Sequence, residues 1–276
     1  MTQCRNATLA ELEQVLGWAA EEGWNPGLDD AQAFYGADPN GFFVAVDQAD
    51  TPIASISVVN HTADFAFLGL YIVKPEFRGQ GIGLSLWTHA LRYAGSRTIG
   101  LDGVEAQQAN YRVSGFVSAS GTTRFTGGLD GQRQADVREA APHDVPQLIE
   151  MEGRASGVVK PDYLAEWFSQ SPKRSTIILD TSRQIDGFAT IRACRSGAKV
   201  GPIVASDADT ASRLIAHAAT LFDGPLTIDV PDAAKGLTHL CQQMGFEPGF
   251  RTARMYRGAP PISQANVFAV TSLELG

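Results

Sequence analysis

The chain has 276 residues, of which 44% are hydrophobic and 19% are charged, and its formal net charge is −8. The length predicts about two domains, and the balance of residue types excludes a disordered chain. The net negative charge disfavours a general nucleic-acid binder, because neutralising phosphates requires clustered lysines and arginines.

The spacing of the cysteines and the lengths of the apolar runs indicate the cellular compartment of the protein. Cys4, Cys194 and Cys241 are too far apart for a disulfide framework or a zinc ribbon, and they fit a reducing cytoplasm. No run approaches the roughly 18 apolar residues that a membrane span needs. The first residues lack the apolar core of a signal peptide. We therefore expect a cytoplasmic protein that binds neither nucleic acid nor a membrane.

The acidic charge is concentrated in the first half. Residues 1–132 hold 7 lysines and arginines against 14 aspartates and glutamates, a net of −7, whereas residues 133–276 have a net of −1. A negative half can attract a cationic substrate. A solvated acidic surface is the alternative, and the sequence leaves both open.

The first half predicts alternating helices and strands. Thr8 is a suitable N-cap for the first helix, and a break rich in glycine and proline follows that helix at 23–27. The predicted elements are a helix at 9–22, a helix at 29–35, strands at 41–46, 52–60 and 64–73, a helix at 81–94, a strand at 98–101, a helix at 105–113 and closing strands from 116.

A linker and a faint repeat divide the chain. Three glycines in Thr126–Gln132 predict a linker near the middle of the sequence. Residues 5–16 resemble residues 138–149, and each half later places Gly-Phe after a predicted strand and helix, which favours a duplication. The second half predicts strands at 175–179, 186–193, 200–204, 226–230, 252–257 and 268–273, with helices at 209–222 and 234–244.

The segment Arg78–Gly83 is the most informative for function. Its glycines let backbone N–H groups approach an anion, and the helix that follows adds unpaired N–H groups and a positive dipole. A P-loop would need a lysine where Leu84 stands, and a dinucleotide fingerprint starting at Gly79 would need glycine there. The segment therefore predicts a diphosphate site of another type.

Arg78, Gly81 and Gly83 fill the pattern Arg/Gln-x-x-Gly-x-Gly/Ala, after the lead-in Val73-Lys-Pro-Glu-Phe77. This arrangement resembles the pyrophosphate loop of the GNAT N-acetyltransferases. The resemblance covers most of residues 1–125, and the second half matches only in outline.

The resemblance implies an α/β (α+β) fold of two tandem GNAT-like domains. Each would hold a mixed, mostly antiparallel twisted sheet, flanked by helices, with a splayed pair of parallel strands. Residues 1–128 would form the catalytic domain that binds acetyl-CoA, and residues 133–276 a degenerate domain that shapes the acceptor pocket. In the second half, Ala205–Ala211 has two aspartates and no glycine where the loop should recur, so it would repel a diphosphate.

The resemblance also implies acetyl-CoA as co-substrate, without a metal. The pantetheine arm would enter the splay between the strand ending at Val73 and the strand at 98–101. The acceptor amine would attack directly in a ternary complex, with a backbone N–H near Tyr71 or Ile72 polarising the acetyl carbonyl. The implied cofactor-binding residues are Tyr71, Ile72, Val73, Arg78, Gly79, Gln80, Gly81, Ile82 and Gly83.

Tyr111 stands four residues before a Gly-Phe pair, where the family often has a tyrosine, and would protonate the leaving thiolate. A packing aromatic is the alternative. For the general base, Asp102 is nearest the splay in the family outline, although Asp102-Gly103 also suits a turn. The other candidates are His61, Asp64, Glu76, Glu105 and a chain of water molecules.

The loop between the first two helices would shape the acceptor pocket in this family. Trp24 would provide an apolar wall, and Asn25 and either Asp29 or Asp30 would hold polar or cationic groups. A core tryptophan and a helix cap are the alternatives.

Together these features predict an acetyl-CoA-dependent N-acetyltransferase for the amine of a small molecule or amino acid. The alternatives are an acyl-CoA-binding sensor without turnover and a protein N-acetyltransferase. The expected partner is a small amine acceptor, and the sequence leaves a homodimer open.

Overall fold

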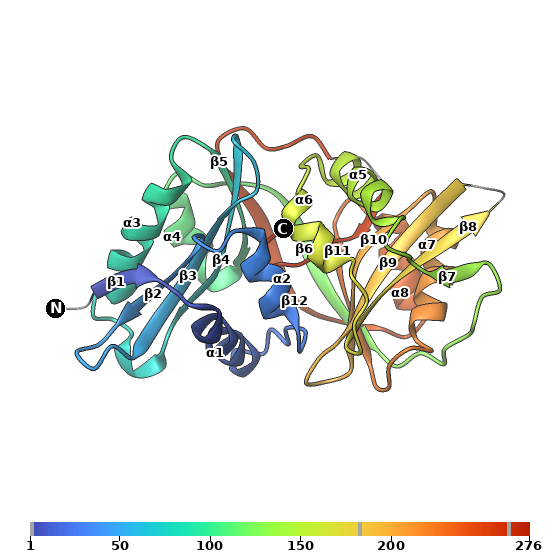
Figure 1. Cartoon of the computed structure of the whole chain (residues 1–276), viewed down its shortest axis with the longest axis horizontal. Helices are drawn as coiled ribbons and strands as arrows, with labels where there is room; N and C mark the ends of the chain where they lie inside the picture. The colour runs from blue at the N-terminus through green and yellow to red at the C-terminus, as the bar shows by residue number, and fades with distance from the viewer. Residues whose placement is uncertain (1–2, 182–183, 264–265) are drawn as a thin grey trace.

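A computed structural model describes residues 3–181, 184–263 and 266–276 (Figure 1). In the first half, Thr8 caps the first helix in a capping box with Glu11, as its sequence position predicts. The elements of this half are β1 (Gln3–Asn6), α1 (Leu9–Glu21), α2 (Asp30–Ala37), β2 (Phe42–Val46), β3 (Pro52–Asn60), β4 (Phe65–Val73), α3 (Ile82–Ala94), β5 (Thr98–Val104), α4 (Gln108–Val113) and β6 (Val117–Gly127).

The second half repeats this order in outline. Its elements are β7 (Val137–Glu139), α5 (Val145–Ser156), α6 (Pro161–Trp167), β8 (Arg174–Thr181), β9 (Gln184–Ala193), β10 (Ala198–Ala205), α7 (Ala208–Ala218), β11 (Leu226–Pro231), α8 (Lys235–Gln243), β12 (Glu247–Arg257) and β13 (Val267–Ala269).

The described strands form one 13-stranded sheet in the order β1-β2-β3-β4-β5-β12-β6-β11-β10-β9-β8-β7, with β13 paired to β10. The pairs β4–β5 and β10–β11 are parallel, whereas the other described pairs are antiparallel. Helices flank this sheet (Figure 1). The expected mixed α/β (α+β) fold is therefore confirmed.

The two halves exchange their closing strands. β12, from the second half, pairs with β5 of the first half, while β6, from the first half, pairs with β11 of the second. β6 and β12 also pair with each other. The sheet is continuous across the molecule because each of these strands completes the hydrogen bonding of the other half.

A shared hydrophobic core joins the halves on one face of the sheet. Phe34 of α2 stacks on Trp167 of α6, with ring centroids 5.9 Å apart and planes at 4°. Both side chains are fully buried, together with Leu12 and Phe188 from elements on either side. Burying such aromatic side chains stabilises the contact between the halves.

Several predicted bounds differ from the structure. β6 runs to Gly127, because β11 extends its pairing to that residue, so the linker begins two residues later than predicted. The helix predicted at 209–222 ends at Ala218, where Thr220 donates back to His217. α6 is absent from the predicted elements. The last strand, β13, spans Val267–Ala269, whereas the predicted strand spans 268–273.

Candidate active site

β4 and β5 diverge halfway along their length. They pair only between Phe65–Leu68 and Thr98–Leu101. Just beyond this point β4 bulges, because Leu70 has a φ of 47°, in the left-handed region that a leucine rarely adopts. The Ser55 hydroxyl donates to the Leu70 carbonyl at 2.7 Å and holds the bulge in place. The sequence therefore folds into the splay that the resemblance implied.

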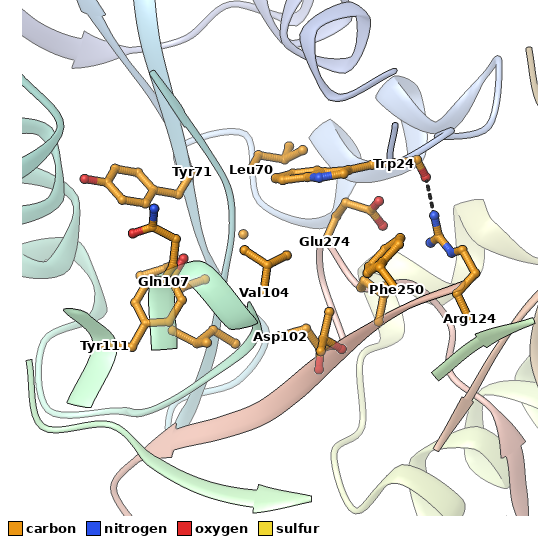
Figure 2. A pocket seen from close by; sticks show the side chains of 15 residues that line it. Trp24, Leu70, Tyr71, Asp102, Val104, Gln107, Tyr111, Arg124, Phe250 and Glu274 are labelled. Carbon is orange, nitrogen blue, oxygen red and sulfur yellow. Dashed lines mark hydrogen bonds between the residues drawn. The ribbon is translucent and has the colours of Figure 1, made fainter. Parts of the chain in front are cut away.

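A cavity occupies the splay (Figure 2). At one end lie the side chains of Tyr71, Gln107 and Tyr111, and at the other lie those of Trp24, Phe250 and Glu274 (Figure 2). The first half thus supplies one wall, while Trp24 of the first half lies with β12 and the segment after β13 at the other. The further lining residues are Leu68, Gly69, Leu70, Leu101, Asp102, Val104, Arg124, Thr252 and Leu273.

A second hollow lies between α3 and α4. It is lined by Leu84 and Trp87 of α3 and by side chains of α4, and it shares Tyr71, Gln107 and Tyr111 with the cavity. Leu84 is exposed, although it is apolar. The shared residues make the two hollows neighbours.

The loop before α3 has the properties of an anion site. Gly79 and Gly81 have φ values of 76° and 77°, which favour glycine. Among the described residues, the backbone N–H groups from Gly79 to Leu84 donate to no protein acceptor. Arg78 turns back, with Nε donating to the Val73 carbonyl at 2.8 Å and Nη2 to Glu22 at 2.6 Å. Free N–H groups at a helix start suit a diphosphate.

The glycine loop contacts β4 directly. A Cβ atom placed on Gly83 would lie 2.6 Å from the Tyr71 hydroxyl oxygen and 3.1 Å from Val73 Cγ2. Glycine is therefore required for the start of α3 to approach the strand. This contact places the start of α3 against β4 at Tyr71, the residue after the bulge. The described residues contain no cluster of three or more metal-ligating side chains.

Tyr111 is held rigidly at the meeting point of the two hollows. Its ring stacks on Trp87, with centroids 5.5 Å apart, and only 8% of the residue is exposed. Gly103 makes room, because a Cβ there would lie 3.0 Å from the Tyr111 ring. Burial and the nearby Tyr71 raise the pKa of the Tyr111 phenol above its ordinary value. The phenol is therefore protonated at neutral pH, as a proton donor must be.

Asp102 lines the cavity, but both its oxygens are engaged. Arg254 of the exchanged strand β12 donates to them through Nε at 2.9 Å and Nη2 at 2.7 Å. Burial raises the pKa of Asp102, while the Arg254 guanidinium opposes that rise. A carboxylate held in such a bidentate pair positions a strand more readily than it accepts a proton from substrate. The role of base for Asp102 stays a prediction.

Of the predicted acceptor residues, the structure brings only Trp24 to the cavity. Its carbonyl accepts from Arg124 at 2.8 Å and from Lys199 at 3.0 Å. Asn25 lies outside, because its amide bonds to the backbone of Ser196.

Asp30 also lies outside the cavity. It is fully buried and pairs with Arg174 at 3.1 Å and with Arg192. Through these bonds the Asp30 carboxylate holds the first half against β8 and β9 of the second half. The sequence could not indicate this, because both arginines lie more than a hundred residues downstream.

The other candidate bases do not line the cavity either. His61 Nε2 lies 2.8 Å from the Leu275 carbonyl, and burial lowers the pKa of its ring to about 3, so the ring is neutral. Asp64, Glu76 and Glu105 are absent from the cavity lining.

Sequence reasoning missed the lining residues that come from the second half. Phe250 and Thr252 reach the cavity only because β12 is exchanged, and Glu274 reaches it because the segment after β13 crosses β4. The alternating arginines after Phe250 are the only local signal near them. Nothing in the sequence around Glu274 marks it.

In the second half, the corresponding splay is filled by the chain itself. β10 and β11 pair only between Ala198–Val200 and Leu226–Ile228. Beyond this, β13 pairs with β10 through Ala269, and Val270 N donates to the Asp229 carbonyl at 3.1 Å. An extended segment therefore occupies the place where the first half has its cavity.

Comparisons with known proteins identify the class that this fold and site define. Residues 9–116 match the acetyltransferase (GNAT) family, and residues 148–269 match an acetyltransferase (GNAT) domain. The chain is 34% identical over 275 residues to the holothin acyltransferase of Pseudoalteromonas sp. (strain SANK 73390), covering 98% of this chain and 93% of the relative. The chain belongs to the GNAT family, and it is an acyltransferase with two GNAT domains in tandem.

Other relatives agree with this assignment. An uncharacterised N-acetyltransferase of Bacillus subtilis is 25% identical over 219 residues, 76% of each chain. A Pyrococcus horikoshii protein assigned as an acetyltransferase shares the fold, with a TM-score of 0.84 at 18% identity, covering 100% of this chain and 96% of the other. A tandem GNAT protein from the clavulanic acid pathway has a TM-score of 0.63 at 16% identity, covering 94% and 99%.

Among the described residues, no helix combines the length and the apolar character that crossing a bilayer requires.

Proposed function

We propose that this protein transfers an acetyl group from acetyl-CoA to the amine of a small molecule. The observation that carries the proposal is the pair of hollows that meet at Tyr71, Gln107 and Tyr111. The outer groove and the glycine loop suit the donor, whereas the inner cavity suits an acceptor. The acyltransferase named for holothin supports a small acceptor, since its identity to this chain extends over nearly the whole length.

The donor binds along the first half in this proposal. The free N–H groups from Gly79 to Leu84 hold the diphosphate, and the pantetheine arm passes Tyr71 toward the bulge at Leu70. The thioester carbonyl then lies at the divergence of β4 and β5. A backbone N–H beside the bulge polarises this carbonyl, and Tyr111 protonates the sulfur when the carbon–sulfur bond breaks.

The second half has a different role. We propose that residues 133–276 do not bind the donor and that they close the acceptor cavity. β13 fills the equivalent splay, and Ser206, Asp207 and Asp209 stand where a diphosphate would bind. Phe250 and Glu274 wall the cavity opposite Tyr111. Such a wall disfavours a folded protein as acceptor, because a lysine on a large surface would have to pass it.

The experiment combines binding and turnover on one sample. Calorimetry with acetyl-CoA should show one site per chain, and thiol release should follow when holothin, simple primary amines or amino acids are added. Peptides with an N-terminal amine or a lysine are tested in parallel as models of a protein acceptor. Binding without release for every acceptor would favour a sensor, and release only with peptides would favour a protein acetyltransferase. Two sites per chain would contradict the role given to the second half.

A further inference from the structure

Glu274 enters the cavity from a segment that the catalytic half does not contain. The segment after β13 crosses β4 at Gly69, next to the bulge residue Leu70. The approach is so close that a Cβ atom on Gly69 would collide with the Glu274 carbonyl oxygen. The Glu274 side chain then points into the cavity beneath the ring of Trp24 (Figure 2).

The Glu274 carboxylate is buried without a partner. The residue is 4% exposed, and among the described residues no side chain or backbone group bonds to its oxygens. The carboxylate faces the cavity, so a ligand bound there can reach its oxygens. Close by, the Thr252 hydroxyl is also buried without a partner and lines the same cavity. The cavity thus presents an anion and a neutral polar group that have no protein partner among the described residues.

The two neighbouring cationic side chains, Arg124 and Lys199, already bond to other groups. Arg124 makes a bidentate pair with Asp229, at 2.7 and 2.8 Å, and donates its remaining nitrogen to the Trp24 carbonyl. Lys199 donates to that same carbonyl at 3.0 Å. Both cations lie near enough to interact electrostatically with Glu274, yet neither forms an ion pair with it.

The other charged and titratable groups around Glu274 come from several elements. Asp102 is paired with Arg254 across β5 and β12, and His61 is a neutral ring that bonds to the neighbouring Leu275. The tyrosines that face the same region are Tyr71, Tyr111 and the buried Tyr163. Of the carboxylates that line the cavity, Glu274 is therefore the one that no protein cation occupies.

We propose that Glu274 binds the acceptor as its ammonium ion and takes the proton that the nitrogen must lose before it attacks. This inference rests on the proposed function. The free amine then forms a nitrogen–carbon bond with the thioester carbonyl, and the carbon–sulfur bond breaks. Tyr111 gives its proton to the departing thiolate and recovers one from the new amide nitrogen. Glu274 releases its proton to solvent, which leaves an amide, a thiol and one proton.

The assignment has a structural consequence for Asp102. Arg254 satisfies both oxygens of Asp102, so this carboxylate fastens the exchanged strand to β5 rather than accepting a proton. Glu274 and Asp102 thus have two separate tasks. The acceptor site then depends on both halves of the chain, because the catalytic half supplies the donor site and Tyr111, and the second half supplies the base.

The test compares Glu274→Gln, Glu274→Asp and Asp102→Asn with the unsubstituted chain. As a matched control, Glu247→Gln makes the same change at an exposed position on β12. Turnover is followed by thiol release with acetyl-CoA and with holothin or a primary amine, from mildly acidic to mildly alkaline pH. Calorimetry with acetyl-CoA and thermal unfolding report whether each variant still folds and binds the donor.

We expect Glu274→Gln to lower kcat/KM for the acceptor by about 10²–10⁴-fold while acetyl-CoA binding is kept. The pH at which its activity rises should move toward alkaline values, where the free amine predominates. Glu274→Asp should retain the original pH profile at a reduced rate, and Glu247→Gln should match the unsubstituted chain.

Near-normal activity and an unchanged pH profile in Glu274→Gln would overturn the inference and leave the proposed function standing. The inference would also fail if Asp102→Asn, folded and binding acetyl-CoA, shifted the profile in place of Glu274→Gln. Absence of transfer by the unsubstituted chain would overturn the proposed function and this inference with it.

Discussion

Tyr111 has a phenol that stays protonated well above neutral pH, because burial and Tyr71 raise its pKa. Tyr111→Phe removes the proton donor and keeps the ring that stacks on Trp87. We expect kcat to fall by about 10²–10⁴-fold, with the KM for acetyl-CoA nearly unchanged, in steady-state thiol-release assays. Because the pKa is raised, deprotonation of Tyr111 should cause no loss of activity of the unsubstituted enzyme near neutral pH.

Tyr93→Phe is the matched control for that change. The Tyr93 hydroxyl donates to Asp38 at 2.9 Å, at the far end of α3, and its pKa is raised to about 12 by burial and this bond. Its loss should lower the unfolding temperature slightly and leave kcat unchanged. A similar kcat for both variants would remove Tyr111 from the reaction.

Gly83 tests the donor site by crowding alone. In Gly83→Ala, the new Cβ would lie 2.6 Å from the Tyr71 hydroxyl oxygen, so either the Tyr71 side chain or the start of α3 must shift. We expect the Kd for acetyl-CoA, measured by calorimetry, to rise about tenfold, which corresponds to roughly 1.4 kcal/mol. Gly128→Ala has no atom within 4 Å of the added carbon and should bind normally. Equal affinities for the two variants would place the donor elsewhere.

Sequence patterns are most informative where the residues that define a feature lie close together in the chain. The glycines from Gly79 to Gly83 sit in one loop, so their spacing alone indicates an anion site. Tyr111 sits at a fixed distance from a Gly-Phe pair on one helix. The position of Asp30 depends on Arg174 and Arg192, and that of Glu274 depends on a crossing over β4, so no local pattern reveals either.

The short helix α2 is fastened to the second half by a buried ion pair. Asp30 pairs with Arg174 on β8 and Arg192 on β9, while the ring of Trp167 lies 4.1 Å from the Arg192 guanidinium carbon. Asp30→Asn leaves two buried cations without their counter-charge, so we expect a loss of about 3–5 kcal/mol in unfolding free energy, measured by urea denaturation. Asp223→Asn, at an exposed loop position, should change it little.

This ion pair should also make the free energy of unfolding depend on pH in the acid range. The two arginines hold the pKa of Asp30 below its ordinary value of 3.8, even though burial opposes them. The unfolded chain therefore binds the proton more tightly, so the stabilisation from this pair is present above pH 3.8 and is lost as the pH falls below it. The acid dependence of unfolding should be weaker in Asp30→Asn. An unchanged dependence would mean that other carboxylates govern acid unfolding.

The exchange of β6 and β12 makes each half depend on the other. β5 pairs with β12 and β6 pairs with β11, so a fragment of residues 1–132 would expose unpaired edges on both strands. It would also uncover Phe34, which stacks on Trp167 of the other half. We expect this fragment to aggregate or to pair with a second copy on gel filtration, with the full chain as control. A stable, monomeric fragment would contradict this dependence.

By itself, the sequence determined the helices and strands of the first half and the glycine loop, because these follow from hydrophobic periodicity and from short spacings along one segment. The resemblance carried by that loop and by the position of Tyr111 implied the family and the splayed strand pair. Only the tertiary structure decided how the halves share one sheet, which carboxylate stays free in the cavity and what fills the splay of the second half. Those features depend on strands and side chains separated by more than a hundred residues, such as Asp102 and Arg254. Their pairing is set by the packing of the whole molecule, which no local pattern encodes.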